Sequence, residues 1–155
     1  MAFEEVKREI IAAPVLAKFS LDARHRVTAD SSAYALGAAV LQKCGEDWRP
    51  VAFISRTLTA AEKRYAQLEK EALAITWACE KFAQYIVGKR LYIETDHKPF
   101  VPLLGMKHLH SLPPRMVRFR LRLMRFDFCI QHIPGKFMYS ADTLHVKSFS
   151  LISGK

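Results

Sequence analysis

Four acidic residues stand out because each lies near the end of a predicted strand or inside a predicted helix. Asp30 and Asp96 each end a predicted strand. Glu71 lies within one predicted helix and Asp142 near the start of another. If the two strands are neighbours in one sheet, their carboxylates meet at one edge, and the two helices can bring the other carboxylates to them. Acidic residues at the ends of strands and helices are also commonplace, so spacing alone does not show that these four belong to one site.

Four carboxylates at one edge would imply a particular chemistry. They would repel one another strongly unless a cation neutralised them. Hard oxygen ligands suit Mg²⁺ or Mn²⁺. Two such ions about 3.5–4 Å apart can stabilise the attacking and the leaving oxygen of a phosphodiester displacement.

One long helix is predicted from Thr59 to about Val87. Thr59 and Glu62 have the spacing of a capping box, and Gly88 supplies the stop. Apolar residues recur at helical spacing along one face. They are Ala61, Leu68, Ala72, Ile75, Cys79, Phe82 and Ile86.

Glu71 is separated from the other acids of this helix. At about 100° per residue, Glu62, Glu69 and Glu80 share one edge of the helical wheel, whereas Glu71 falls on the opposite shoulder of the apolar stripe. Two interpretations stay open at this point. Glu71 is either a carboxylate at the rim of the core, with its stem on apolar surface, or a member of a converging acid set.

The elements before the helix predict a sheet. Three short β-like stretches at 26–29, 34–42 and 48–55 are joined by turns, which predicts an antiparallel meander. Residues 91–95 form a further strand after the helix, and strand, helix, strand is typical of a parallel crossover unit. Side chains just past the carboxyl ends of such strands line functional sites. The fold class is therefore α/β.

The rest of the chain supplies further helices and one more strand. Helices are predicted at 3–12, 99–104 and 139–147, a loop at 106–112 and a strand at 126–133. Pro113 and Pro114 begin another helix. Its two faces carry arginines at 115, 118, 122 and 125, and Val117, Leu121 and Met124 with Phe119 nearby. Trp48 and Trp77 are assigned to the core.

Composition narrows the class of protein. The 155 residues are half hydrophobic and a quarter charged, as in a globular domain. The net charge of +9 favours a polyanion such as nucleic acid, although an unspecialised basic surface gives the same value. The sequence predicts no membrane span and no signal peptide. Three widely spaced cysteines favour neither disulfides nor a zinc site. We expect an intracellular protein, cytoplasmic or within a virus-like particle.

Several sequence blocks together resemble the ribonuclease H domain of gypsy-type LTR-retroelement reverse transcriptases. They match in order and spacing across about residues 26–146, and residues 1–24 resemble the segment that connects the polymerase to this domain. The blocks are Thr28-Ala29-Asp30-Ser31-Ser32 with Ala35-Leu36-Gly37-Ala38, the stretch 50–59 with Ala61-Glu62-Lys63-Arg64-Tyr65, Glu69-Lys70-Glu71-Ala72-Leu73-Ala74, Thr95-Asp96-His97-Lys98-Pro99, and Pro134-Gly135-Lys136 with Ala141-Asp142.

The resemblance implies a ribonuclease H fold, a five-stranded mixed sheet flanked by helices. It implies a metal-dependent endoribonuclease that cleaves the RNA strand of RNA–DNA hybrids by two-metal hydrolysis, giving 5′-phosphate and 3′-hydroxyl ends. The matching metal-binding and catalytic acids are Asp30, Glu71, Asp96 and Asp142. Two Mg²⁺ or Mn²⁺ ions per site are implied. Selection of the hybrid would rest on 2′-hydroxyl contacts and duplex shape.

The resemblance also sets the expected organisation and partners. Residues 1–24 form a leader, 25–147 the ribonuclease H domain and 148–155 a tail. The RNA–DNA hybrid and the polymerase part of the same reverse transcriptase are the expected partners, and a homodimer stays open. Arg115, Arg118, Arg122 and Arg125, with His97 and Lys98, are candidate nucleic-acid contacts. The arginines fit a solvated helix face or a contact with the polymerase part or a second subunit equally well. A structural role for His97 is as well supported as a contact with the nucleic acid.

Some positions depart from the family pattern. Many relatives continue Leu-Ser-Arg after the last acid, whereas this chain has Leu144-His145-Val146. The loop 134–140 holds no His, and we interpret His132 as a strand-end side chain. The alternative function is therefore a weak or inactive domain of the same fold that serves nucleic-acid binding or dimerisation. A transposase-type nuclease of related fold is a third reading that the blocks do not favour.

Overall fold

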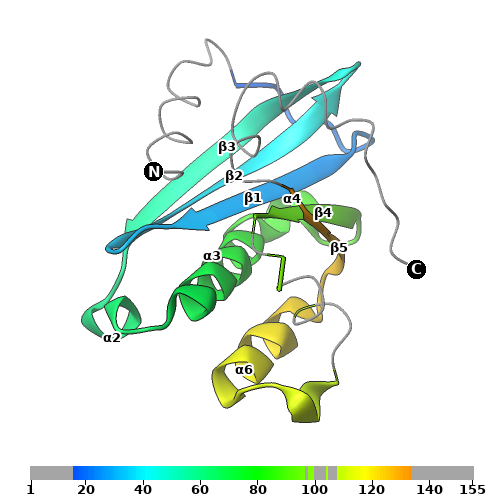
Figure 1. Ribbon diagram of the computed structural model, residues 1–155. Coiled ribbons are helices and arrows are strands. Elements are labelled where there is room, and N and C mark those ends of the chain that lie inside the picture. Colours follow the sequence, from blue (N-terminus) through cyan, green and yellow to red (C-terminus); the bar gives the residue numbers. More distant parts are fainter. Residues whose placement is uncertain (1–15, 97, 100–103, 105–107, 134–155) are drawn as a thin grey trace.

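Five strands form one mixed sheet in the order β3-β2-β1-β4-β5 (Figure 1). The computed structural model describes residues 16–96, 98–99, 104 and 108–133. The strands are β1 (His25–Ser31), β2 (Ala35–Cys44), β3 (Asp47–Thr57), β4 (Arg90–Thr95) and β5 (Asp127–His132). The helices are α2 (Ala60–Lys63), α3 (Gln67–Lys81), α4 (Ala83–Ile86), the 3₁₀ helix η1 (Leu109–Ser111) and α6 (Pro114–Leu123).

The first three strands form the predicted antiparallel meander. β1 pairs with β2 and β2 with β3. Gly45, with φ +63°, takes up the left-handed backbone of the β2–β3 turn. The register shifts between Val40 and Leu41, opposite the segment of β3 that contains Pro50. This irregularity suits a residue that lacks the N–H needed for the ladder.

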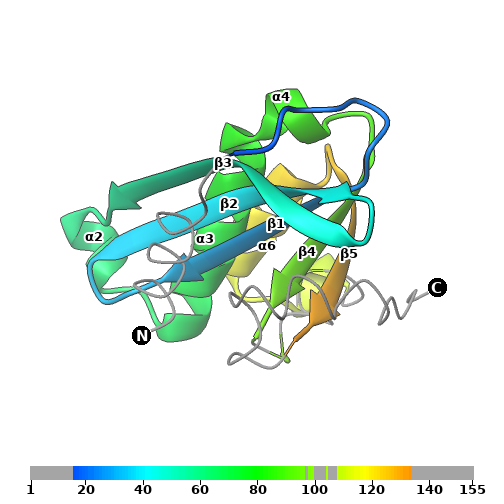
Figure 2. The same cartoon turned by 90° about the horizontal axis from the view of Figure 1, so that it is seen from above.

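The last two strands run parallel to β1. β4 pairs with β1 and β5 with β4, both in parallel. The predicted crossover is therefore confirmed, with α3 as its main helix. Figures 1 and 2 show α3 and α6 on the same side of the sheet. Val27 and Ile93 of the sheet, Ala74 of α3 and Phe119 of α6 belong to one buried core.

The predicted single helix over 59–87 is wrong, because the chain forms three helices there. The capping box at its start is confirmed: the Thr59 hydroxyl accepts from the N–H of Glu62 at 3.2 Å. The helix ends after Lys63, and a second N-terminus follows, where the Glu69 carboxylate accepts from the N–H of Ala66 at 3.0 Å. Gly88, with φ +81°, follows the last helix as predicted.

α6 buries only part of the predicted apolar set, because Phe119 is buried and Val117 packs against the core, but Leu121 and Met124 are not. Met116, Phe119 and Leu123 are buried, whereas Leu121 and Met124 are 50% and 58% exposed. Both sets have helical spacing, so periodicity alone did not distinguish them. The core side of α6 is set by its packing against α3, which the sequence pattern does not contain.

Of the remaining predictions, some are confirmed, one is corrected in part, and others lie outside the described residues. Trp48 and Trp77 are buried, as predicted, and His132 is the last residue of β5. Part of the predicted loop 106–112 forms η1. The predicted helices 3–12 and 139–147 lie outside the described residues, as does most of 99–104. In the described part of the leader, the N–H of Ala17 binds the carbonyl of Pro50, and Phe19 packs on Tyr85.

A buried ion pair lies on the sheet face opposite the helices. Val27 and Ala29 belong to the core beneath α3, so the alternating Arg26 points to the other face. There Arg26 lies 2.8 Å from Glu94 of β4, with both side chains less than 5% exposed. The guanidinium also stacks on Trp48 of β3, 4.1 Å from the ring centroid. The pair therefore links three strands across the sheet.

We expect Glu94→Ala to lower the free energy of unfolding by about 3–5 kcal/mol, because it leaves the Arg26 charge buried without this carboxylate. Asp127→Ala is the control, since it breaks the exposed pair with Arg90, whose side chains are 54% and 64% exposed. This change should cost less than about 1 kcal/mol. Urea denaturation of both variants measures the difference. Equal, small losses would contradict a stabilising role for the buried pair.

Candidate functional site

The register of β1 and β4, continued beyond the paired residues, would bring two of the predicted acids to the same edge. The parallel pairing of β1 and β4 runs from His25 opposite Leu91 to Thr28 opposite Glu94. Two residues further along, the same register would bring Asp30 and Asp96 side by side on strands about 4.8 Å apart. Asp30 is buried within β1, and Asp96, directly after β4, is half-buried.

The neighbour of Asp30 on its other side is a glycine. Asp30 pairs with Gly37 of β2 in the antiparallel ladder. Gly37 has no side chain, which permits a close approach of another group at this position of β2.

Glu71 reaches the same region from α3. Its side chain is buried, and Oε1 accepts hydrogen bonds from the Ser31 hydroxyl at 2.8 Å and from Nε2 of Gln67 at 2.6 Å. Nε2 of Gln67 also donates to Oγ of Ser31 at 3.2 Å. Glu71 is thus bound to the residue that directly follows Asp30 in β1. The Glu71 carboxylate is therefore buried and hydrogen-bonded rather than solvated.

The electrostatics of Glu71 report a second carboxylate nearby. Its pKa is raised to about 7, first by burial and also by the negative charge of Asp96. The hydrogen bonds from Ser31 and Gln67 act in the opposite direction, because they stabilise the ionised form. A buried carboxylate with a like charge beside it is the environment that a bound cation would relieve.

The fourth predicted acid, Asp142, lies outside the described residues, and so does His97. Within the ranges that the structure describes, no three Asp, Glu, His or Cys side chains form a group that could hold a metal ion. What the described residues bring together is Glu71, Ser31 and Gln67, with the charge of Asp96 close to Glu71 and Asp30 adjacent to Ser31 in the chain.

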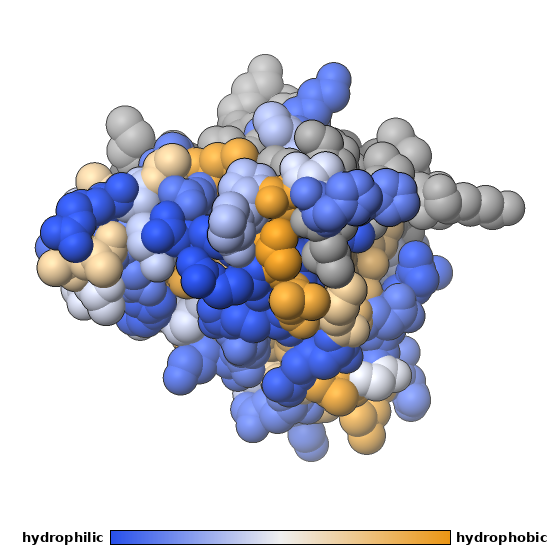
Figure 3. Space-filling model, turned by 90° about the horizontal axis from the view of Figure 1, so that it is seen from below, coloured by the Kyte–Doolittle hydropathy of each residue, from blue (hydrophilic) through white to orange (hydrophobic). Residues whose placement is uncertain are grey.

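The predicted arginine stripe, which consists of Arg115, Arg118 and Arg122 of α6 and Arg125 just after this helix, divides into two pairs. Arg115 binds Glu69 of α3 at 2.7 Å, and Arg122 binds Glu80 of the same helix. Arg118 and Arg125 are exposed, as is Lys98. Figure 3 views the molecule from the side of α6 and shows a mostly hydrophilic face crossed by a narrow apolar strip. Half of the stripe therefore attaches α6 to α3, and the other half faces solvent.

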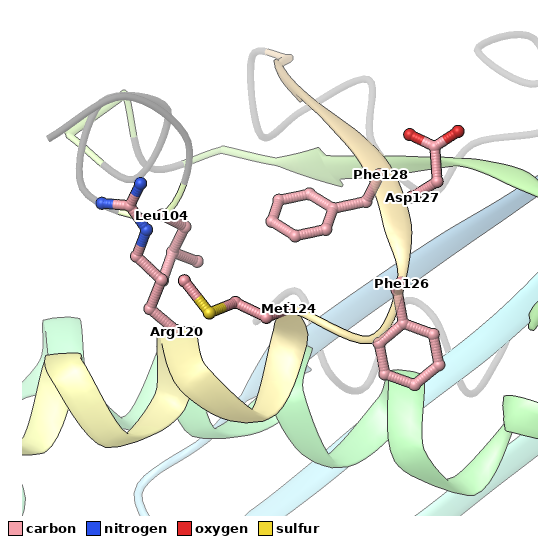
Figure 4. A pocket seen from close by; sticks show the side chains of 6 residues that line it. All are labelled: Leu104, Arg120, Met124, Phe126, Asp127 and Phe128. Carbon is pink, nitrogen blue, oxygen red and sulfur yellow. The ribbon is translucent and has the colours of Figure 1, made fainter. Parts of the chain in front are cut away.

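A pocket of about 280 Å³ lies between α6 and β5 (Figure 4). It is lined by Leu104, Arg120, Met124, Phe126, Asp127 and Phe128. None of the predicted metal-binding acids belongs to this lining, so the pocket is separate from the candidate site.

Sequence reasoning missed the two residues that hold Glu71. The sequence pattern places Ser31 in a turn and indicates no role for Gln67. Signals for both exist, because Ser31 directly follows Asp30 and Gln67 lies one helical turn before Glu71. Neither signal identifies a hydrogen bond until the strand and the helix are packed together.

The family follows from comparison with known proteins. The model of the RNase H-like domain found in reverse transcriptase matches residues 20–126, well over half of the chain. The chain belongs to this family. Among relatives of this RNase H-like domain, the retrovirus-related Pol polyprotein from transposon 297 of Drosophila melanogaster is 38% identical over 146 residues, 92% of this chain and 13% of the polyprotein. The Pol polyprotein from transposon gypsy of the same organism is 28% identical over 156 residues, 99% of this chain and 14% of the polyprotein.

Solved structures show the fold of this RNase H-like domain. The foamy viral protease-reverse transcriptase in complex with RNA/DNA hybrid aligns with a TM-score of 0.60 and 16% identity, over 84% of this chain and 18% of that one. RNase H1 from the archaeon Halobacterium salinarum aligns with a TM-score of 0.54 and 20% identity, over 81% of this chain and 98% of that one. The predicted ribonuclease H fold and the predicted resemblance to gypsy-type reverse transcriptases are confirmed.

The share of the related polyproteins that the chain covers, and the character of its helices, complete the comparison. The RNase H-like chain spans only a small part, 13–14%, of the polyproteins quoted above. In the part of the chain that the structure describes, no helix combines the length and apolar character needed to cross a membrane.

The raised pKa of Glu71 predicts a pH-dependent stability. The folded state holds the proton up to about pH 7, whereas the ordinary value is 4.5, so stability falls as pH rises between these values. Glu71→Gln keeps an acceptor for Ser31 and Gln67 but removes the charge. We expect the stability of this variant relative to the unsubstituted protein to rise by up to about 3 kcal/mol between pH 5 and pH 8.

Thermal melts in EDTA across this pH range measure the effect without bound metal. Glu46→Gln, in the exposed turn after β2, is the matched control for loss of one carboxylate charge. If the melting temperatures of Glu71→Gln and the unsubstituted protein differ by the same amount at every pH from 5 to 8, the pKa of Glu71 is not raised in the folded state.

Proposed function

We propose that the chain is a divalent metal-dependent endoribonuclease that cleaves the RNA strand of RNA–DNA hybrids during reverse transcription. One observation carries the proposal. A buried carboxylate, Glu71, is hydrogen-bonded to the residue next to Asp30 and lies within the field of Asp96. Membership of the RNase H-like domain family supports the same reading.

The donor set fits divalent metal ions. Asp30, Glu71 and Asp96 offer carboxylate oxygens, and Asp142 is the proposed fourth ligand from the sequence match. Mg²⁺ and Mn²⁺ prefer such oxygens, and burial beside a like charge makes Glu71 a better partner for a cation than an exposed acid. When two such ions are bound, they supply activation of water and neutralisation of the charge that develops on the phosphate.

The residues of the chain would divide the remaining work. Asp30 of β1 and Asp96, directly after β4, would supply carboxylate oxygens from two adjacent strands. Glu71 is held through Oε1, so its orientation does not need to be selected from many rotamers. Hydrolysis of the phosphodiester on the 3′-oxygen side would leave a 5′-phosphate and a 3′-hydroxyl, and no side chain would need to act as a covalent nucleophile.

Charge supports a nucleic acid as the substrate. The chain has a net charge of +9, and Lys98, Arg118 and Arg125 are exposed. One structural neighbour is a reverse transcriptase in complex with RNA/DNA hybrid. Cationic side chains grip phosphates without reading bases, and a ribose 2′-hydroxyl distinguishes the RNA strand. The polymerase part of a longer polyprotein is the proposed protein partner, since the related polyproteins extend far beyond this chain.

The decisive experiment incubates the full chain with an end-labelled RNA–DNA hybrid in Mg²⁺ or Mn²⁺. We expect cleavage of the RNA strand only, and a loss of at least about a hundredfold for Asp30→Asn, because that change removes a carboxylate from the proposed metal site. Asp127→Asn is the control, as it removes an exposed acid on β5. RNA–RNA and DNA–DNA duplexes should stay intact.

Two results would overturn the proposal in different ways. Hybrid binding without cleavage would support the alternative, a binding domain of the same fold. Cleavage that persists in Asp30→Asn would show that the activity does not come from this acid set.

The division of the arginine stripe predicts which side chains bind the hybrid. Arg118→Ala with Arg125→Ala should reduce the slope of log affinity against log salt by about 1–2, because each exposed arginine would neutralise about one phosphate. Arg49→Ala with Arg24→Ala, which removes two other exposed charges, controls for net charge alone. Fluorescence anisotropy with a labelled hybrid, in Ca²⁺ to prevent cleavage, gives both slopes. An equal effect of Arg49→Ala with Arg24→Ala would indicate non-specific charge attraction.

A further inference from the structure

Ser31, Gln67 and Glu71 form a closed triangle of hydrogen bonds. Both Ser31 Oγ and Gln67 Nε2 donate to Oε1 of Glu71, at 2.8 and 2.6 Å, and the two donors are joined to each other at 3.2 Å. Ser31 comes from the end of β1 and Gln67 from the first turn of α3. The triangle therefore joins the central strand and the main helix at the edge of the sheet where Asp30 and Asp96 lie.

The Ser31 hydroxyl and the Gln67 amide both donate to the same carboxylate oxygen of Glu71. Oε1 is occupied by both bonds, so the triangle fixes the rotation of the group and with it the direction in which Oε2 is presented. A free Glu side chain loses about 1.5–2 kcal/mol of rotamer entropy when it is ordered. Two hydrogen bonds to a charged group are strong enough to offset that cost before any ligand binds.

The position of Gln67 is itself fixed by α6. Gln67 begins α3 because the Glu69 carboxylate caps the preceding N–H of Ala66 with Oε1. The other oxygen of Glu69 accepts from Arg115 of α6 at 2.7 Å, and the Arg115 guanidinium lies 3.9 Å from the ring centroid of Tyr65. An arginine that the sequence suggested for phosphate binding thus holds the start of the helix that carries Gln67.

We propose that Ser31 and Gln67 are positioning residues that orient Glu71 for metal binding. The proposal rests on the proposed function, because it assigns these residues to the support of the same carboxylate. Side chains that orient a metal ligand typically change metal affinity or activity by about 10–100-fold when they are replaced. Such residues need not contact the hybrid themselves.

The test measures Mn²⁺ binding to the full chain by electron paramagnetic resonance, together with hybrid cleavage. Ser31→Ala and Gln67→Met each remove one donor at little change in volume. We expect each to weaken Mn²⁺ binding about tenfold and to lower kcat while the KM for hybrid stays within about twofold. Ser31→Thr keeps the hydroxyl and should restore the affinity. Ser55→Ala and Gln84→Met, both exposed, are the matched controls.

A double-mutant cycle separates this role from general damage to the fold. In a Glu71→Ala background, Ser31→Ala and Gln67→Met should have no further effect on Mn²⁺ binding, because they act only through Glu71. Additive losses would overturn the proposal, as would unchanged Mn²⁺ affinity with a raised KM, which would indicate direct contact with the hybrid. A fall of more than about 5 °C in the melting temperature would show a structural role and also overturn it.

Failure of the positioning role and failure of the proposed function give different results. If the unsubstituted chain binds Mn²⁺ and Glu71→Ala weakens binding, but Ser31→Ala and Gln67→Met bind normally, only the positioning role is wrong. If the unsubstituted chain binds no Mn²⁺ and cleaves no hybrid, the proposed function is wrong and the positioning role is lost with it.

Discussion

The parallel pairing of β1 with β4 is the constraint on which the candidate site depends. It aligns the carboxyl ends of two adjacent strands, and the register that pairs Thr28 with Glu94, continued by two residues, would bring Asp30 and Asp96 to the same edge. Parallel neighbours need a crossover on one face of the sheet, and α3 provides it. The same topological requirement therefore brings Glu71 over the edge at which the two strand-end acids lie.

Concentrating acids at one edge has a cost that the surrounding contacts partly offset. Burial and the charge of Asp96 both oppose ionisation of Glu71, whereas the Ser31 and Gln67 donors favour it. On the opposite face of the sheet, the buried charges of Arg26 and Glu94 neutralise each other, and Arg26 also stacks on Trp48. One buried charge is thus matched within the chain, while the Glu71 carboxylate is held in an environment that suits an external cation.

Sequence reasoning succeeded where the determinant is local or repeated. The Thr59 capping box, the Gly45 and Gly88 turns, the strand pattern and the parallel crossover all follow from short-range signals. It failed where packing decides. The apolar residues of α6 fit more than one helical spacing, and contact with α3 selects Met116 and Leu123 over Leu121 for burial. The triangle around Glu71 joins residues 36 to 40 positions apart as well as one helical turn, so it needed the assembled sheet and helix.

The break between α2 and α3 shows how one local correction changes the functional argument. In a continuous helix, Gln67 would be an ordinary interior residue and Glu69 a solvated acid. Because the helix restarts at Gln67, Glu69 becomes a cap whose second oxygen is free to bind Arg115. Arg115 and Arg122 are then structural links between α6 and α3, which leaves Arg118 and Arg125 as the members of the stripe suited to phosphate contact. The arginines are alike in sequence, and the acids of α3 separate them into two roles.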